Sequence, residues 1–166
     1  MRKSLLLDAD VVIDLHALGL FGKITKAYNI CLTRAVLDEA RYFKKEGAKI
    51  DIDVKDITII EDVDLETLQK VQREAKEARL AIDPGESVSI AHLLHAEEAV
   101  AFCSCDQAAI KLISYMHLER KSISLETALR NAGYHEKTLY SRHLQRTFKA
   151  CIKEGKALRI QFKRLV

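Results

Sequence analysis

The sequence has no tryptophan, one proline, six glycines and four cysteines among its 166 residues. Four cysteines are too few for a disulfide scaffold in a chain of this length, which favours a reducing, cytoplasmic setting. The scarcity of proline and glycine excludes low-complexity linkers. No window holds eighteen uninterrupted apolar residues, so we expect no membrane span. The first apolar run is broken by Asp8 and Asp10 and no small-residue cleavage site follows, so we expect no signal peptide.

What the chain does contain suits one globular domain covering residues 1–166, because 48% of the residues are hydrophobic and 31% are charged. The net charge of +3 hides an asymmetry. Residues 137–166 hold nine Lys and Arg against one acid, Glu154, a net charge of +8 that leaves −5 for the rest. This basic C-terminal segment favours contact with a phosphate backbone.

Two apolar runs end abruptly at an acid. Leu5-Leu6-Leu7 stops at Asp8, with Asp10 two residues later, and the run 99–105 stops at Asp106. Such runs are typical of buried parallel strands, and ligands bind outside the carboxyl ends of strands in α/β sheets. We therefore expect these acids to project into a site, although a helix N-cap is the alternative role for Asp8 and for Asp10.

Between these runs, strand and helix patterns alternate, which predicts an α/β fold with a parallel sheet. We expect a turn at Asp83-Pro84-Gly85. Further strands are expected at 30–33 and within 50–63, where apolar and acidic residues alternate. Helices are expected at 11–18, 21–28, 34–45, 64–79, 87–97, 107–119, 124–133 and 136–154.

Four carboxylates, Asp8, Glu39, Glu86 and Asp106, lie at the end of an apolar strand or in the first turns of a helix. If the strands are parallel neighbours, these acids converge on one edge of the sheet. Carboxylate oxygens suit Mg²⁺ or Mn²⁺ better than zinc. The pattern therefore predicts metal-assisted phosphodiester hydrolysis. For Glu39 a solvated helix face, and for Glu86 an interaction with the helix dipole, remain alternatives.

The order of these motifs resembles the PIN domain. The resemblance lies in the Asp-tipped first strand, Glu39 within Thr33-Arg34-Ala35-Val36-Leu37-Asp38-Glu39, the segment Gly85-Glu86-x-x-x-Ile90-Ala91, and Ser104-Cys105-Asp106. It covers about the first three quarters of the chain. It implies a three-layer α/β/α fold with a central parallel sheet over residues 1–120, with 121–166 as a basic helical C-terminal extension.

The same resemblance implies an Mg²⁺- or Mn²⁺-dependent endoribonuclease, as in the toxins of many toxin–antitoxin pairs. Asp8, Glu39, Glu86 and Asp106 would then be the catalytic metal ligands, with Asp10 and Ser104 as accessory residues. Asp83 is an alternative ligand to Glu86. RNA is the expected substrate, with an antitoxin protein and a second copy of the chain as further candidate partners. We expect Arg142, Arg146, Lys149 and Lys153 to contact the nucleic acid.

Other functions remain open from the sequence. Asp8-Ala9-Asp10-Val11 also resembles the opening of haloacid-dehalogenase-like phosphatases, in which the first Asp is a nucleophile and the second a general acid. A non-catalytic nucleic-acid-binding module is a third possibility. A zinc site from His92, His95, Cys103 and Cys105 is disfavoured, because two cysteines within a β-run are also typical of small buried residues. A helix-turn-helix within 124–148 is disfavoured as well.

Overall fold

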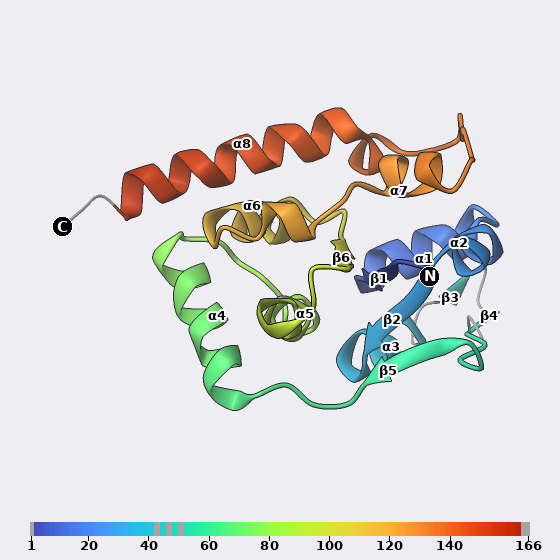
Figure 1. Ribbon diagram of the computed structural model, residues 1–166, viewed down its shortest axis with the longest axis horizontal. Helices are drawn as coiled ribbons and strands as arrows, with labels where there is room; N and C mark the ends of the chain where they lie inside the picture. Colours follow the sequence, from blue (N-terminus) through green and yellow to red (C-terminus); the bar gives the residue numbers. More distant parts are fainter. Residues whose placement is uncertain (1, 42–43, 46–47, 50–51, 164–166) are drawn as a thin grey trace.

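A computed structural model describes residues 2–41, 44–45, 48–49 and 52–163. Its centre is a four-stranded parallel sheet in the order β5-β2-β1-β6 (Figure 1). The strands are β1 (Ser4–Leu7), β2 (Asn29–Thr33), β5 (Ile57–Ile60) and β6 (Val100–Cys103). In register, Leu6 of β1 lies between Cys31 of β2 and Phe102 of β6, so the two Asp-tipped strands are direct neighbours.

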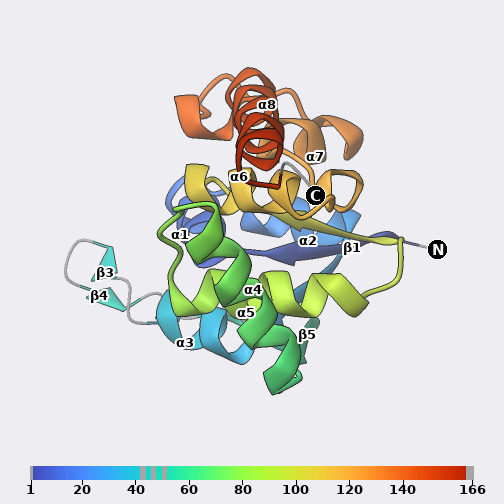
Figure 2. The ribbon, with the colours of Figure 1, turned by 90° about the vertical axis from the view of Figure 1, so that its left-hand side faces the viewer.

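Helices connect these strands. They are α1 (Ala9–Ala17), α2 (Phe21–Ala27), α3 (Arg34–Arg41), α4 (Leu65–Glu77), α5 (Pro84–His95), α6 (Gln107–Tyr115), α7 (Leu125–Asn131) and α8 (Gln145–Phe162). Two 3₁₀ turns, η1 (Glu119–Lys121) and η2 (Ser141–His143), precede α7 and α8. A small antiparallel pair, β3 (Lys44–Lys45) and β4 (Ala48–Lys49), stands away from the body in Figure 2.

The sheet carries a hydrophobic cluster on each face, because side chains alternate along a strand. Leu5 and Leu7 pack with residues of α1, α2, α3 and α7. Leu6 and Phe102 pack on the other face with residues of α4, α5 and α6. The layered arrangement in Figure 2 is compatible with the expected three-layer α/β/α fold. Among the described residues, no helix is both long and apolar enough to cross a membrane.

Some predicted boundaries are wrong. Helix α1 begins at Ala9 because Asp8 already caps it. Helix α3 ends at Arg41, and Lys44–Lys45 is a strand instead of the end of that helix. Of the span 50–63, only Ile57–Ile60 joins the sheet, and Ile50 lies outside the described residues. Helix α6 stops at Tyr115, four residues earlier than expected.

The predicted turn at Asp83-Pro84-Gly85 is a helix start. Asp83 is the N-cap of α5, and Pro84 occupies the first helical position, where its missing N–H is no loss. Helix α5 therefore begins at Pro84 and ends at His95, not over 87–97. A turn signal and an N-cap signal share the same residues, and the apolar residues that follow in the helix decide between them.

The predicted helix 136–154 is also displaced, since α8 begins at Gln145 and runs to Phe162. The residues before it form η2, whose Arg142 and His143 reach back to Asp14 on α1. A continuous helix through 136–154 would conflict with the extended backbone of Tyr140 and Leu144, which flank that turn.

Helix α8 lies directly against α6, on the side away from the sheet (Figures 1 and 2). A Cβ atom at Gly155 would collide with the backbone oxygen of Lys111 and lie 2.7 Å from Cβ of Ser114, so only glycine permits this close approach. Ser114 Oγ donates to the Ile152 oxygen at 2.7 Å, and Arg159 Nη1 donates to the Ser114 oxygen at 2.6 Å. The basic C-terminal helix is thus tightly packed on the α/β core.

Candidate functional site: carboxylates at the edge of the sheet

Asp8 lies at the end of β1 and is 3% exposed. Its backbone N–H donates to the Cys103 oxygen of β6, so both strand ends meet at this point. Asp8 Oδ1 accepts from the N–H of Ala9 at 2.9 Å as the cap of α1, and Oδ2 accepts from Ser104 Oγ at 2.8 Å. Burial raises the pKa of Asp8 to about 7, against the opposing effect of the two hydrogen bonds.

Ser104 connects Asp8 to Asp106. While its hydroxyl donates to Asp8, its oxygen accepts from the N–H of Asp106 at 3.1 Å. Asp106 is itself an N-cap, since its Oδ1 accepts from the N–H of Ala109 at 2.9 Å. The cap interpretation and the site interpretation are therefore compatible for both acids, because one carboxylate oxygen suffices for the cap.

Glu86 lies in the first turn of α5 and is 4% exposed. Its Oε2 accepts from the N–H of Asp83 at 2.9 Å, while Asp83 Oδ1 accepts from the N–H of Glu86 at 2.7 Å, which completes a capping box. Burial raises the pKa of Glu86 to about 8, and the charges of Asp8, Asp106 and Asp83 add to this effect. Glu86 and Asp83, the two alternative ligands, thus lie together.

Glu39 approaches the same helix start from α3. A Cβ atom built on Gly85 would lie 2.9 Å from Glu39 Oε2 and 3.4 Å from Asp83 Oδ1, so both carboxylates border Gly85. Burial, followed by the charges of Asp83 and Asp10, raises the pKa of Glu39. The carboxylates of Glu39 and Asp83 therefore lie close to each other at the start of α5.

Asp10 is exposed in the first turn of α1. Its pKa is raised by partial burial and by the charges of Asp14, Asp106 and Asp83, whereas Arg142 opposes the shift. Within the described residues Asp10 accepts no hydrogen bond that would give it a structural task. It borders the carboxylate cluster, which we define as Asp8, Asp10, Glu39, Asp83, Glu86 and Asp106.

The carboxylate cluster is not arranged as a closed metal site. In the part of the chain that the structure describes, no group of three or more His, Cys, Asp or Glu side chains is placed so that it could hold a metal ion. The donor chemistry nevertheless fits Mg²⁺ or Mn²⁺, because all members are carboxylates. Each of the four with a raised pKa is destabilised by burial and neighbouring negative charge, which a cation would relieve.

The disfavoured zinc set is not brought together as a site. Cys103 and Cys105 are buried, and burial raises the pKa of both thiols far above the usual range. His95 Nε2 is instead 2.9 Å from Thr67 Oγ1 of α4. These residues therefore pack as parts of the core and of the α4–α5 contact.

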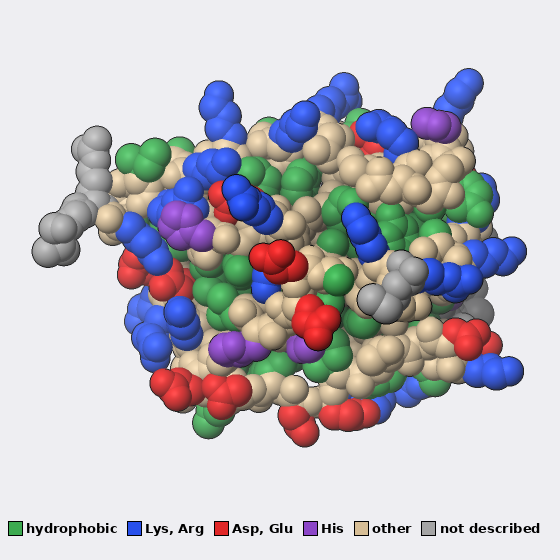
Figure 3. All heavy atoms as spheres, viewed as in Figure 1, with side chains coloured by type: hydrophobic (Ala, Val, Ile, Leu, Met, Phe, Trp, Pro, Cys, Tyr) green, Lys and Arg blue, Asp and Glu red, His purple; other side chains and the backbone are tan. Residues whose placement is uncertain are grey.

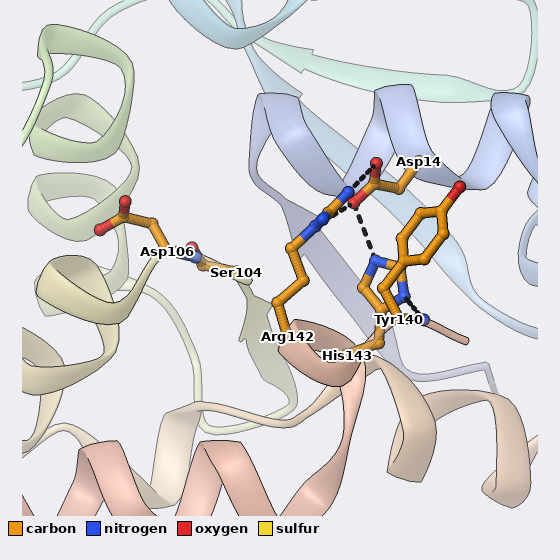
Figure 4. Close-up of polar contacts among 6 residues, drawn as sticks. All are labelled: Asp14, Ser104, Asp106, Tyr140, Arg142 and His143. Carbon is orange, nitrogen blue, oxygen red and sulfur yellow. Dashed lines mark hydrogen bonds and ion pairs between the residues drawn. The ribbon is translucent and has the colours of Figure 1, made fainter.

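Sequence reasoning missed an ion pair beside the cluster (Figure 4). Arg142 Nε and Nη2 donate to the two oxygens of Asp14 at 2.9 and 2.8 Å, and His143 Nε2 lies 2.8 Å from Asp14 Oδ2. Burial opposes ionisation of Asp14, but these hydrogen bonds outweigh it and lower its pKa. The partners are separated by 128 residues, and no local pattern links them.

The predicted nucleic-acid contacts therefore divide into two kinds. Arg146, Lys149 and Lys153 are exposed on one side of α8, and no described residue pairs with them. Lys and Arg side chains stand out along the α8 side of the molecule in Figure 3. Arg142 differs, since Asp14 compensates its charge while 48% of its side chain stays exposed.

Neither the known protein families nor the curated proteins and solved structures include a match to this chain.

Proposed function

We propose that this chain is a divalent-metal-dependent endoribonuclease with a PIN-like arrangement of acids. The observation that carries the proposal is the pair Asp8 and Glu86, two carboxylates about 4% exposed or less, whose pKa values are raised to about 7 and about 8. Hydrogen bonds orient both side chains, but no cation compensates them within the described residues. Buried carboxylates with raised pKa values cluster at functional sites, and a bound cation would compensate their charge.

The chain's own residues would perform complementary tasks. Asp8 is oriented by Ser104, and Glu86 is held by the capping box, so both present carboxylate oxygens from rigid elements. Glu39, Asp10 and Asp106 are less buried and have rotatable side chains that can complete the ligand set. A bound Mg²⁺ or Mn²⁺ would supply positive charge to the phosphate oxygens and lower the pKa of a water molecule.

The row Arg146, Lys149 and Lys153 supports RNA as the substrate class. Spacings of three and four residues keep the three cations on one helical face, and their exposure leaves them accessible to a phosphate backbone. Contacts of this kind give affinity that depends on salt and only weakly on sequence. A role as the toxin of a toxin–antitoxin pair belongs to the same proposal, and an adjacent gene for a small DNA-binding protein would support it.

The test is cleavage of an end-labelled single-stranded RNA with Mn²⁺, Mg²⁺ or EDTA, with the same sequence as DNA in parallel. Direct attack by water leaves no 2′,3′-cyclic phosphate, unlike attack by the ribose 2′-hydroxyl, so the product ends separate this activity from metal-independent ribonucleases. We expect cleavage with Mn²⁺ and none with EDTA. Intact RNA under all conditions, or equal cleavage by Asp8→Asn, would contradict the proposal.

The two alternatives give different results in the same experiment. Phosphomonoester hydrolysis inhibited by vanadate would favour the haloacid-dehalogenase-like phosphatase, with Asp8 as nucleophile. RNA binding that is indifferent to Mg²⁺ and to Asp8→Asn would favour the non-catalytic binding module.

A further inference from the structure

A groove of about 560 Å³ borders the carboxylate cluster at Asp10. Its lining is Asp10, Ile13, Asp14, Ala17, Tyr140 and Arg142. One wall is the side of α1. The other wall is the segment at η2, which lies far from α1 in the sequence and returns to it after α7. The ligand that enters this groove would therefore lie next to the candidate catalytic acids.

On the η2 wall a guanidinium lies over an aromatic ring, and a tilted imidazole lies beside the same ring. The guanidinium carbon of Arg142 lies 4.5 Å from the ring centroid of Tyr140, and the imidazole of His143 lies 5.1 Å from the same ring (Figure 4). Tyr140 is nevertheless 43% exposed, although large hydrophobic side chains are usually covered. A stack of an aromatic ring and a guanidinium, left open to a groove, is a surface on which nucleobases pack.

Arg142 is fixed in this position. Its Nε and Nη2 are both used by Asp14, which is itself held by the buried His143. This fork leaves Nη1 without a partner among the described residues, so its two N–H groups remain for a further acceptor. A guanidinium held in this way presents its remaining donors with little loss of side-chain freedom, which suits a phosphate oxygen.

The opposite wall completes a site of mixed character. Ile13 and Ala17 supply apolar surface from α1, while Asp10 lies at the end that borders the carboxylate cluster. Apolar surface and an exposed aromatic ring suit the faces of a base in single-stranded RNA, and the unused donors of Arg142 Nη1 suit the adjoining phosphate.

We infer that this groove is a nucleotide subsite, in which a base of the RNA packs on Tyr140 and Arg142 while Arg142 Nη1 donates to the adjoining phosphate. Tyr140 and Arg142 are thus positioning residues that fix one nucleotide beside the scissile bond. This inference rests on the proposed ribonuclease function for its substrate, although base stacking can be measured without cleavage.

The test uses the full chain in EDTA and single-stranded RNA oligonucleotides that carry 2-aminopurine at one position each. Stacking quenches the fluorescence of 2-aminopurine. The fluorescence of the oligonucleotide labelled at one particular position should therefore decrease on binding to the wild-type protein. We expect Tyr140→Phe to retain this quenching and Tyr140→Ala to lose it, with affinity weakened about tenfold, as for the loss of one stacked base. The exposed Leu65→Ala on α4 is the matched control and should change neither reading.

With Mn²⁺ present, Tyr140→Ala should raise KM or change the cleavage position, whereas Tyr140→Phe should behave like wild type. Arg142→Lys, which keeps the charge but loses the fork, should weaken binding further. Quenching and cleavage unchanged in Tyr140→Ala would overturn the subsite and leave the ribonuclease intact. Quenching that depends on Tyr140 in a protein that cleaves no RNA would instead contradict the proposed function and retain the subsite.

Discussion

Asp8 and Asp14 are both carboxylates of the β1–α1 unit, six residues apart, and both are mostly buried. Asp14 accepts from Arg142 and His143, and its pKa lies below its ordinary value. Among the described residues, the carboxylate of Asp8 accepts only from Ser104 and the N–H of Ala9, and its pKa is raised to about 7. The two acids therefore differ in role: Asp14 joins two distant segments of the chain, whereas no cationic side chain of the described residues compensates Asp8.

The largest effect is expected from Asp8→Asn on cleavage. The loss of one oxygen ligand should remove several kcal/mol of transition-state stabilisation, a decrease of about a thousandfold in the rate. Stability should be unchanged or higher in metal-free buffer at pH 7.5, because an uncompensated charge is removed. Cleavage rates and Tm measure the two effects. Asp62→Asn, at an exposed acid between β5 and α4, is the control.

The opposite result is expected for Asp14→Ala. This change leaves the fully buried imidazole of His143 and the guanidinium of Arg142 without their acceptor, at a cost of about 3 kcal/mol in the free energy of unfolding. Urea denaturation would measure it, with Asp62→Ala as the surface control. If Asp14→Ala were as stable as wild type while Asp8→Ala were not, the assignment of the two roles would be reversed.

The dependence on pH should distinguish the two acids as well. The raised pKa values of Asp8 and Glu86 mean that the folded protein keeps protons that the unfolded chain loses above its ordinary carboxyl pKa. Their contribution to stability is therefore fully present at low pH and is lost as pH rises through about 7 to 8. We expect a decrease of several kcal/mol between pH 5 and pH 8 without metal, since each pH unit over which the folded state holds one extra proton costs about 1.4 kcal/mol.

Manganese should reverse this decrease. Because Mn²⁺ binds the ionised carboxylates, it should raise Tm more at pH 8 than at pH 5. Asp8→Asn should flatten both the pH dependence and the response to Mn²⁺, whereas Asp14 titrates below this pH range. Thermal denaturation at the two pH values, with and without Mn²⁺, measures both. Equal responses of wild type and Asp8→Asn would contradict a role for Asp8 in binding the ion.

The smallest effect is expected for Ser104→Ala. Its hydroxyl donates to Asp8 and accepts from the N–H of Asp106, so the change removes two hydrogen bonds and costs about 1 kcal/mol in stability. Because the hydrogen bond from Ser104 lowers the pKa of Asp8, its loss should raise that pKa further. The rise of cleavage rate with pH should then move to higher pH. Ser104→Thr, which keeps the hydroxyl, is the matched control.

The strand ends were predictable because local signals agree there. An apolar run followed by Asp marks both β1 and β6, and this Asp caps the next helix, directly after β1 and three residues after the end of β6. The α/β class and the parallel sheet follow from this repetition, and the structure confirms them. The nearness of Glu39 to Asp83 also follows in outline, since α3 comes directly after β2 at the same edge.

The region after α7 was not predictable in the same way. The apolar stripe of the expected helix 136–154 is helical in period, but Arg142 and His143 find Asp14 across 128 residues and hold the chain in a 3₁₀ turn. Tertiary contacts of this kind override a local pattern. The groove at Tyr140 depends on the contact of Arg142 and His143 with Asp14. The local sequence therefore does not predict this groove.

Helix α6 connects the carboxylate cluster to helix α8, which carries Arg146, Lys149 and Lys153. Its N-cap is Asp106, and Lys111 and Ser114 form the surface against which Gly155 seats α8. Adding or deleting one residue in α6 would rotate everything after it by about 100° around the helix axis. The surface of Lys111 and Ser114 would then no longer face α8. As a result, Arg146, Lys149 and Lys153 would lose their orientation relative to Asp106. The length of this nine-residue helix therefore fixes where the three cations of α8 lie relative to the acids.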